Sequence, residues 1–482
     1  MKILLINPSL TEAATGQYEQ KMEQERGVYP PLGLAYIAAA LEEKNHEIKI
    51  VDCDVEKNYE EKILQLCRDW QPEMAGFYAM TWNYRLADKL SREIKKINSL
   101  TITVLGGPNV TTMPKASLQF GNFDFGIMGE GEKTIIELID QLVQKDDLNF
   151  EKILGLVWRK DGQIIINPTR PLIDDLDTIS FPARHLLPME KYFDVFSKNK
   201  KFATIIATRG CPFNCTFCDR QNRMGRKWRR RSPQNIAQEI KQIIERYDIR
   251  EFMFFDDNLI IDKDWAYQLM SELKNLKITW ECRERVDMID EPILKAMKEA
   301  GCYRIRFGFE SGDNRILKVL KKDITVEQSL ACAKLCQKVG IEIFGYFIIG
   351  APQETAETIK KTINLALKIS SDFALFSKMI LIPGSEIFDY GVKTDQIRED
   401  YWKRFIQGLE TDGAPSLTKE TLSEKIIDEN IKLADRKFYF RPIFILKKIM
   451  AIKNLNHLIK QAKLAFALFF KTKKSGDEDT VN

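Results

Sequence analysis

The chain has 482 residues, 44% of them hydrophobic and 29% charged, with a formal net charge of +4 at pH 7. This length predicts two or three domains, and the composition is typical of a globular protein rather than a disordered one. Nine cysteines, an odd number, favour a reducing cytoplasm over an extracellular disulfide framework. The apolar run at the N-terminus is too short for a signal peptide, and no run reaches the roughly 18 apolar residues of a membrane span.

Strand-like and helical patterns alternate in the first part of the chain. Strands are expected at residues 2–7, 48–52, 74–79, 101–105 and 124–128. Between the first two, the apolar residues of the segment 31–43 recur at the spacing of one helix face. This alternation predicts a parallel sheet with helices on both faces, which binds ligands at the carboxyl ends of its strands.

Three loops at these strand ends are candidates for a ligand site. They are Asn7-Pro8, Gly106-Gly107-Pro108-Asn109 and Gly129-Glu130-Gly131-Glu132. Paired glycines let a backbone approach a bulky ligand closely. Glycine after a strand is also ordinary turn chemistry, so these loops alone do not establish a site.

A connecting segment follows. Residues 155–167 form a hairpin pattern with Asp161-Gly162 at its turn, and residues 174–182 are typical of an irregular linker.

From residue 203 onward the strand–helix alternation repeats. Strands are expected at 203–208, 251–255, 278–282, 303–309, 341–349 and 374–381, and helices at 232–247, 264–276, 291–300, 325–339 and 354–369. Six such units predict a partial (β/α) barrel. Active sites in such barrels lie at the carboxyl ends of the strands.

The loop after the first barrel strand carries three thiols, Cys211, Cys215 and Cys218, within eight residues. This set can bind three irons of a [4Fe–4S] cube and leave the fourth iron open, as catalysis requires and a structural site avoids. Half of a zinc site and three unrelated buried thiols are the alternatives. Zinc would need a fourth ligand nearby, but the nearest histidine is His185 and the next cysteine is Cys282.

The other strand ends also carry polar or glycine residues. They are Asp256-Asp257-Asn258, Arg283 and Arg285, Glu310-Ser311-Gly312, Gly350-Ala351-Pro352 and Pro383-Gly384-Ser385. A carboxylate can hold ribose hydroxyls or an ammonium group. Each of these groups alone is equally well explained as a helix cap or a turn.

The C-terminal region is basic. Residues 431–474 contain twelve Lys or Arg and one acidic residue, Asp435, interleaved with bulky apolar side chains. Amphipathic helices on an anionic membrane surface and a helical cap on the barrel both fit this pattern. Nucleic acid is not expected, since basic charge alone carries no specific signal. Residues 475–482 are expected to be a disordered polar tail.

The cysteine loop, with Phe217 before its last thiol, resembles the cluster loop of the radical S-adenosylmethionine (SAM) superfamily. The preceding domain resembles the cobalamin-binding module fused to one branch of that superfamily. The matching segments are Pro30-Pro31-Leu32-Gly33-Leu34-Ala35-Tyr36-Ile37, Gly106-Gly107-Pro108-Asn109-Val110-Thr111, Gly129-Glu130-Gly131-Glu132-Lys133-Thr134, Arg229-Arg230-Arg231-Ser232-Pro233, Gly308-Phe309-Glu310-Ser311-Gly312 and Pro383-Gly384-Ser385.

The resemblance implies an α/β fold in four parts. Residues 1–145 would form a Rossmann-like cobalamin-binding domain and 146–198 a hairpin and linker. Residues 199–395 would form a partial (β/α)6 radical SAM barrel of the TIM type. Residues 396–482 would form a helical, basic C-terminal region with the disordered tail.

The resemblance also implies the cofactors, a [4Fe–4S] cluster, SAM and cobalamin, and the residues that hold them. The cluster ligands would be Cys211, Cys215 and Cys218. Residues implied for SAM are Phe217, Asp257, Glu310, Ser311, Gly345 and Gly350. Residues implied for cobalamin are Asn7, Pro8, Pro31, Leu32, Gly33, Gly106, Gly107, Pro108, Asn109, Thr111, Gly129, Glu130 and Gly131.

Two departures from the family pattern concern cobalamin. None of the three histidines, His46, His185 and His457, lies in an Asp-x-His-x-x-Gly loop, so we expect cobalamin to bind without a histidine ligand. Many relatives carry histidine where Asn109 stands, which argues against a specific role for this side chain and leaves the backbone role of the loop.

The implied activity is reductive cleavage of SAM followed by methylation of an unactivated carbon of a small-molecule substrate. A radical cyclase or rearrangement enzyme without methyl transfer, and a regulatory protein that senses cobalamin and redox state, are the alternatives. The implied partner is a reductant such as flavodoxin or ferredoxin. A lipid or isoprenoid substrate, and peripheral contact of a cytoplasmic protein with the inner face of the membrane, are hypotheses from the basic C-terminus.

Overall fold

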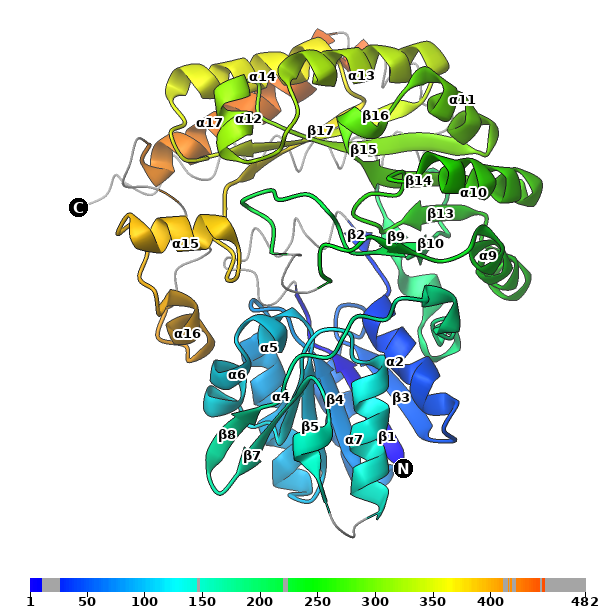
Figure 1. Ribbon diagram of the computed structural model, residues 1–482, viewed down its shortest axis with the longest axis vertical. Coiled ribbons are helices and arrows are strands. Elements are labelled where there is room, and N and C mark those ends of the chain that lie inside the picture. Colours follow the sequence, from blue (N-terminus) through cyan, green and yellow to red (C-terminus); the bar gives the residue numbers. More distant parts are fainter. Residues whose placement is uncertain are drawn as a thin grey trace.

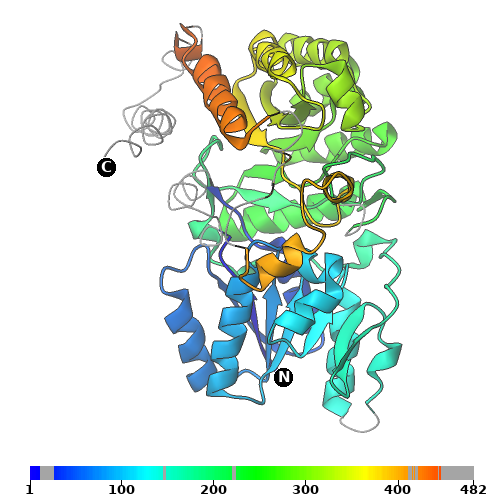
Figure 2. The same ribbon diagram turned by 90° about the vertical axis from the view of Figure 1, so that its left-hand side faces the viewer.

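The computed structural model describes residues 1–10, 27–144, 148–219, 224–410, 415, 417, 422–442 and 444–446. Two α/β lobes lie one above the other, with the N-terminal sheet in one and an open barrel in the other (Figure 1), and the side view shows the same two lobes (Figure 2). The carboxyl ends of the N-terminal strands point toward the barrel (Figure 1).

The N-terminal lobe is built on a seven-stranded sheet of order β3-β1-β4-β5-β6-β7-β8. The first five strands in this order are parallel, as predicted. They are β1 (Lys2–Asn7), β3 (Glu47–Asp52), β4 (Met74–Tyr78), β5 (Ile102–Gly106) and β6 (Phe125–Ile127).

Helices cover both faces of this sheet. They are α2 (Leu32–Glu42), α3 (Tyr59–Asp69), α4 (Tyr84–Ile97), α5 (Pro108–Thr112), α6 (Pro114–Phe120) and α7 (Glu132–Gln144). Because successive strand residues point to opposite faces, Leu4 and Ile6 pack with α3 and α4, while Ile3 and Leu5 pack with α2 and α7. A strand with four consecutive buried apolar residues, such as Ile3–Ile6 of β1, therefore fits only between two helical layers.

The hairpin predicted as a connector extends the N-terminal sheet. Its strands β7 (Leu156–Lys160) and β8 (Gln163–Ile166) are antiparallel, and β7 pairs with β6. Asp161 and Gly162 at the turn both have positive φ, the geometry that favours Asp-Gly in a two-residue hairpin loop. The domain boundary at residue 145 stays a prediction.

The linker is irregular, as expected. It contains three short 3-10 turns, η2 (Leu176–Thr178), η3 (Arg184–Leu186) and η4 (Met189–Lys191), and ends in β9 (Phe193–Asp194), which pairs with β2 (Gly27–Val28).

The second lobe contains a six-stranded parallel sheet in sequential order, which confirms the partial barrel. Its strands are β10 (Ala203–Ile205), β13 (Glu251–Phe254), β14 (Thr279–Glu284), β15 (Cys302–Glu310), β16 (Glu342–Ile349) and β17 (Phe373–Lys378). Its outer helices are α9 (Pro233–Tyr247), α10 (Lys263–Leu276), α11 (Glu291–Glu299), α13 (Val326–Val339) and α14 (Ala356–Ile369). Helix α9 begins as predicted, because the Ser232 hydroxyl accepts from the Asn235 N–H and proline is its first residue.

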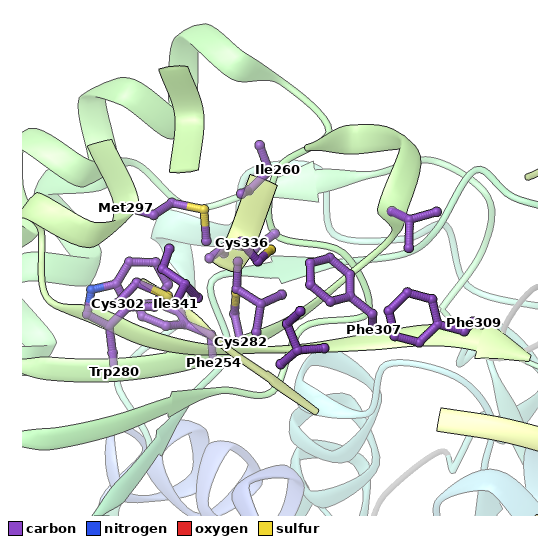
Figure 3. Close-up of a cluster of buried hydrophobic side chains, with 14 of the residues drawn as sticks. Phe254, Ile260, Trp280, Cys282, Met297, Cys302, Phe307, Phe309, Cys336 and Ile341 are labelled. Carbon is purple, nitrogen blue, oxygen red and sulfur yellow. The ribbon is translucent and has the colours of Figure 1, made fainter. Parts of the chain in front are cut away.

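The apolar core of this lobe lies between the strands and the outer helices (Figure 3). Phe254, Trp280, Phe307 and Phe309 are almost fully buried there. Four cysteines outside the predicted cluster loop, Cys282, Cys302, Cys332 and Cys336, are buried in the same core and act as small apolar side chains.

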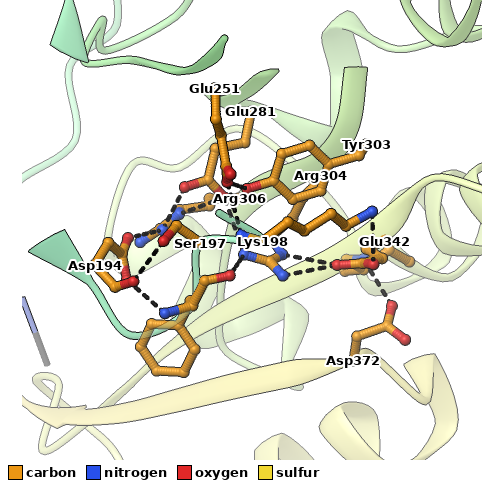
Figure 4. A network of polar contacts seen from close by, with 12 residues as sticks. Asp194, Ser197, Lys198, Glu251, Glu281, Tyr303, Arg304, Arg306, Glu342 and Asp372 are labelled. Carbon is orange, nitrogen blue, oxygen red and sulfur yellow. Dashed lines mark hydrogen bonds and ion pairs between the residues drawn. The ribbon is translucent and has the colours of Figure 1, made fainter. Parts of the chain in front are cut away.

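Ion pairs fill the barrel interior at the amino ends of its strands (Figure 4). The Arg306 guanidinium donates to Asp194 at 2.7 Å and to Glu281 at 2.6 Å. Arg304 donates to Glu281 at 3.2 Å and to Glu342 at 2.7 Å. We call these five residues the barrel floor. Four of these charges are buried, Glu342 is half-buried, and all are paired, which is the condition for burying charge without a large penalty.

Two helices were not expected from the sequence, α12 (Asn314–Val319) and α15 (Glu386–Lys393). The region 396–482, expected to be helical but without bounds for its helices, contains α16 (Tyr401–Ile406) and α17 (Glu424–Tyr439) among its described residues. Helix α16 returns to the N-terminal lobe, where the Trp402 and Trp82 rings meet edge to face at 4.9 Å. Helix α17 packs along β17, and the Tyr439 hydroxyl donates to the Ala374 carbonyl at 2.5 Å.

The described part of the basic C-terminal region therefore acts as a helical cap, one of the two predicted alternatives. Residues 447–482, which carry the predicted membrane contact and tail, lie outside the described residues. Within the described residues, no helix has both the length and the apolarity needed to cross a bilayer.

Candidate functional site

The cysteine loop begins after a short strand, β11 (Thr208–Arg209), that pairs with β12 (Arg229–Arg230). None of the three thiols is part of a disulfide, and all three are half-buried. Hydrogen bonds fix the loop to the barrel: the Thr216 N–H donates to the Leu320 carbonyl at 3.0 Å, and the Thr216 carbonyl accepts from the Ile387 N–H at 2.9 Å. The end of α12 and the first turn of α15, far apart in sequence, thus hold the middle of the thiol segment.

Gly210 sets the direction in which the chain enters this loop. Its φ is +88°, and a Cβ at this position would clash with the carbonyl oxygen of Lys227. The next residue, Cys211, donates its N–H to the Gly225 carbonyl at 3.3 Å. Only glycine satisfies both the positive φ and the close approach of the two chain segments.

Polar groups lie beside two of the thiols. The Asn258 amide nitrogen is 3.2 Å from the Cys211 sulfur. The Arg285 guanidinium lies 3.7 Å from the centre of the Phe213 ring and 4.0 Å from the Cys215 sulfur. Burial raises the pKa of the Cys211 and Cys215 thiols. A bound metal ion would offset this effect, because it stabilises the thiolate form.

This donor set fits an iron–sulfur cube. Three thiols on one constrained loop, none of them in a disulfide and two with a hydrogen-bond donor beside the sulfur, are the kind of ligand set such clusters use. Among the described residues, no three His, Cys, Asp or Glu side chains converge as ligands of a single metal ion. A cube needs no such convergence, because each thiolate binds a different iron.

The structure separates the residues implied for SAM. Phe217 is half-buried and packs in the same apolar cluster as Ile348 of β16. A Cβ at Gly345 would instead meet the Phe309 and Phe347 rings, on the helix-facing side of the sheet. The neighbouring Tyr346 and Ile348 take the other face, toward the barrel interior. The role of this strand in binding SAM stays a prediction, and within it Tyr346 and Ile348, rather than Gly345, lie on the interior face.

Glu310 and Ser311 follow β15. Glu310 has a φ of +58° at a register shift of the strand, and its carboxylate pairs with the buried Lys322 ammonium at 2.9 Å. The Ser311 hydroxyl is fully buried and lies 3.3 Å from the Thr362 hydroxyl of α14. Glu310 thus stays near the thiols through Lys322, whereas Ser311 is directed into the helix layer.

Two carboxyl groups at other strand ends differ in exposure. Asp256 is buried and accepts from the Ala207 N–H at 3.0 Å and the Thr208 hydroxyl at 2.7 Å. Burial raises the pKa of Asp256 to about 7, against the opposing effect of these hydrogen bonds. Asp257, the implied SAM residue, is half-buried beside it. Gly350 donates its N–H to the buried Glu354 carboxylate.

Glycine loops of the N-terminal lobe form the rim that faces the barrel. The Thr111 hydroxyl joins two of them, since it donates to the Gly107 carbonyl and accepts from the Gly129 N–H, both at 2.9 Å. Tyr78, which sequence analysis missed, lies between Gly33 and Gly107. Gly129 is exposed, has a φ of +70°, and has open space where a Cβ would point. Such a glycine-lined rim fits a bulky ligand.

The thirteen residues implied for cobalamin divide by exposure. Those at least partly exposed are Pro31, Gly33, Gly106, Gly107, Pro108, Thr111, Gly129 and Gly131. Those buried are Asn7, Pro8, Leu32, Asn109 and Glu130.

The buried polar members make internal contacts. The Asn7 amide donates to Asp52 at 2.8 Å, the Asn109 amide donates to the Ser117 hydroxyl at 2.8 Å, and the Pro8 carbonyl accepts from Asn83 at 2.7 Å. These side chains shape the loops from below, so any contact with a ligand comes from their backbone.

Neither described histidine approaches this rim. The His46 ring contacts the N-terminal amine at 3.1 Å, at the opposite end of the sheet, and the His185 ring contacts Glu42 at 2.8 Å. His457 lies outside the described residues. The loops therefore fit a cobalamin bound through backbone and shape, without a histidine from the described part of the chain.

Buried ion pairs join the two lobes beside the thiols. Arg209, two residues before Cys211, donates to Glu130 at 3.0 Å and to Glu132 at 2.6 Å. Arg229 donates to Glu130 at 2.8 Å and to the Ile173 carbonyl at 2.7 Å. We call these four charged residues the interlobe clamp. Glu130, implied for cobalamin, thus has its carboxylate engaged by the cysteine-loop strand and its partner strand.

Comparison with known proteins agrees with this architecture. The sequence model described as the radical SAM superfamily matches residues 205–366, and the model described as the B12 binding domain matches residues 24–139. The chain is 33% identical to an uncharacterized methyltransferase of Pyrococcus horikoshii, over 96% of this chain and 97% of that protein. It is 30% identical to the cytidylyl-2-hydroxyethylphosphonate methyltransferase of Streptomyces wedmorensis, over 80% of each.

Other similar proteins include a cyclase and two solved structures. The anaerobic magnesium-protoporphyrin IX monomethyl ester cyclase of Rubrivivax gelatinosus is 28% identical over 80% of this chain and 69% of its own length. The cobalamin-dependent SAM radical enzyme OxsB aligns with a TM-score of 0.73 at 16% identity, over 98% of this chain and 71% of OxsB. The methyltransferase TsrM of Kitasatospora setae aligns with a TM-score of 0.66 at 17% identity, over 82% of this chain and 75% of TsrM.

Proposed function

This chain belongs to the cobalamin-binding branch of the radical SAM superfamily, and we propose that it methylates an unactivated carbon of a small-molecule substrate. Its cofactors are a [4Fe–4S] cluster, SAM and cobalamin. Enzymes of the superfamily require a reductant, and a flavodoxin or ferredoxin is our proposal for it.

One observation carries this proposal. Arg209 and Arg229 join the cysteine loop to the glycine loop of the N-terminal rim through buried ion pairs. A site that only generated radicals would need no fixed relation to a second cofactor module. A site that combines SAM cleavage with methyl transfer does, because catalysis between two cofactors depends on their orientation.

The chemistry of the bound groups would be reductive cleavage of SAM to methionine and a 5′-deoxyadenosyl radical, hydrogen abstraction from the substrate, and methyl transfer from cobalamin. The chain binds and orients these groups. Cys211, Cys215 and Cys218 would hold three irons. Phe217 and Ile348 would offer an apolar wall to the adenine, with Glu310 and Asp257 for the ribose and the methionine moiety of SAM.

The N-terminal rim would hold cobalamin between Gly33, Gly107 and Gly129, with Tyr78 beneath it. The two lobes would exclude water from the space between them. The protein thereby protects the reactive species and lets the cofactors carry the hard chemistry.

A radical cyclase is the second candidate, favoured by the 28% identity to the Rubrivivax cyclase. Methyl transfer is preferred, because the two relatives at 30% identity or more are both named methyltransferases.

Methyl-labelled SAM separates the two candidates. The anaerobically reconstituted enzyme is incubated with labelled SAM, a reduced flavodoxin and a small-molecule fraction of a cell extract. Our proposal predicts label in a new product, in step with 5′-deoxyadenosine. A product that forms with 5′-deoxyadenosine and carries no label would refute methyl transfer and support the cyclase.

A lipid or isoprenoid substrate, reached at a membrane surface, remains a proposal that rests on the sequence of residues 431–474. Membrane sedimentation of the full chain and of a chain ending at residue 446 tests it. Equal sedimentation of the two would contradict it.

A further inference from the structure

One arginine in the barrel interior differs from its neighbours. Arg283 lies near the carboxyl end of β14, two residues after Glu281 of the barrel floor. Because alternate strand residues share a face, its side chain belongs to the interior face with Glu281. Its guanidinium lies 4.5 Å from the centre of the Phe255 ring. Phe255 is itself half-buried in the interior, where its ring meets that of Tyr29 at 5.0 Å.

The neighbouring arginines are paired and Arg283 is not. Arg304 and Arg306 are satisfied by carboxylates of the barrel floor, and Arg285 forms an ion pair with Asp287 at 2.9 Å. Among the described residues, no carboxylate or other hydrogen-bond acceptor contacts the Arg283 guanidinium, whose one recorded contact is the Phe255 ring. A half-buried guanidinium offers five donors in a fixed fork, suited to a planar or tetrahedral anion.

Arg283 lies in the part of the barrel where a substrate would bind. The barrel floor closes the interior below it, since Tyr29 donates to Asp194 at 2.9 Å and Asp194 accepts from Arg306. Above it, the loop that follows β13 contacts the cluster loop, where Asn258 meets the Cys211 sulfur. A group bound at Arg283 therefore lies inside the barrel, between the floor and the proposed site of radical formation.

We propose that Arg283 binds an anionic group of the substrate, a phosphonate, phosphate or carboxylate, and so orients the acceptor carbon toward the radical. This inference rests on the proposed function and adds the class of substrate to it. Phe255 supports the guanidinium from one side through its ring face and leaves the fork open to the ligand. Arg283 is thus a specificity-determining residue.

The carboxylate of SAM is the competing ligand for this arginine. The experiment therefore keeps SAM at saturation while other anions are titrated. Anaerobically reconstituted holoenzyme, with SAM and without reductant, is titrated calorimetrically with inorganic phosphate, methylphosphonate and acetate. The variants are Arg283→Gln, Arg283→Lys and the control Arg250→Gln. Arg250 is exposed and directly precedes β13, at the amino ends of the strands, whereas Arg283 lies near their carboxyl ends.

We expect at least one of the three anions to bind the wild type once per chain. Arg283→Gln should weaken this binding at least about tenfold, the loss expected for one charge-assisted hydrogen-bonded pair. The anion affinity of Arg283→Lys, which keeps the charge and loses the fork of donors, should lie between those of the wild type and Arg283→Gln. The affinity of Arg250→Gln should match that of the wild type. Tighter binding of phosphate or methylphosphonate than of acetate would identify a phosphorus oxyanion, and the reverse would identify a carboxylate.

Three results would overturn the proposal: no anion binding to the wild type, equal binding to Arg283→Gln, or a tenfold loss of SAM affinity in that variant with unchanged anion binding. Cobalamin and iron content check that each variant is loaded. If Arg283→Gln fails to load, the comparison of Arg283→Lys with Arg250→Gln decides. Because anion binding needs no turnover, the result stands whether or not methyl transfer is observed.

Discussion

The interlobe clamp makes the sharpest prediction about stability. Glu130 accepts hydrogen bonds from Arg209 at 3.0 Å, Arg229 at 2.8 Å and the Ile173 N–H at 2.7 Å, and its side chain is 3% exposed. In Glu130→Gln the two guanidinium groups lose the charge between them. Removing one member of a buried ion pair costs about 3–5 kcal/mol.

The expected loss lies at the lower end of this range, about 3 kcal/mol. Arg209 keeps its ion pair with Glu132, and Arg229 keeps hydrogen bonds to the carbonyls of Ile173 and Met224. For a domain of about 200 residues this corresponds to a fall in melting temperature of roughly 6–12 °C. Iron and cobalamin content should fall with it, because the clamp joins the loops that hold both groups.

The stability difference should depend on pH. Burial raises the pKa of Glu130, but Arg209, the Ile173 N–H and Arg229 together outweigh this effect and hold the pKa below its usual range. A carboxyl group with a lowered folded-state pKa adds stability that is complete above its unfolded pKa of about 4.3 and disappears as the pH falls through the folded pKa. The gap between wild type and Glu130→Gln should therefore be full at pH 7 and shrink below about pH 4.

Thermal unfolding followed by circular dichroism measures this effect. The matched control is Glu151→Gln, which removes an ion pair with Lys160 in which both side chains are more than half exposed. Exposed pairs contribute about 0–1 kcal/mol, so the control should melt within about 3 °C of the wild type. Equal melting temperatures for Glu130→Gln and Glu151→Gln at pH 7 would refute the role of the clamp.

Two further substitutions probe the cysteine loop. Gly210→Ala should abolish iron binding, because its Cβ would clash with the Lys227 carbonyl; Gly162→Ala, with a similar φ of +77° and open space, should retain iron and cost about 1–2 kcal/mol. Iron analysis after reconstitution decides, and equal iron content in the two variants would contradict the argument. Arg285→Gln should lower the cluster reduction potential by about 60 mV or more, since a cation near the Cys215 sulfur stabilises the more negative reduced state. An unchanged potential in spectroscopic titration would count against this placement.

Much of the fold follows from sequence because its strands and helices are periodic. Runs such as 2–7, apolar at nearly every position, fit only strands buried on both faces, and the predicted bounds of β1 match those of the structure. The cysteine motif could also be recognised from sequence, because the type and spacing of its ligands are local properties. Short helices could not be recognised in this way: α16 has six residues, too few for a helical period to emerge.

The orientation of side chains and contacts between lobes required the structure. Alternation assigns Gly345 and Tyr346 to opposite faces of β16, but no local signal says which face is the interior. Glu130 and Arg209 are 79 residues apart, so their ion pair depends on how the two lobes meet. Sequence analysis named Glu130 and Arg229 separately, each as part of a different loop that matches the family. The structure shows that the two side chains form an ion pair with each other.

The central claim is that the three-thiol loop binds a cluster that cleaves SAM. Anaerobically reconstituted wild type, Cys215→Ala and the control Cys67→Ala are incubated with SAM and a reductant, and 5′-deoxyadenosine is quantified. Cys67 is buried in the N-terminal lobe and should be dispensable for cleavage. The account predicts 5′-deoxyadenosine from the wild type and Cys67→Ala and none from Cys215→Ala. Continued formation by Cys215→Ala would contradict it.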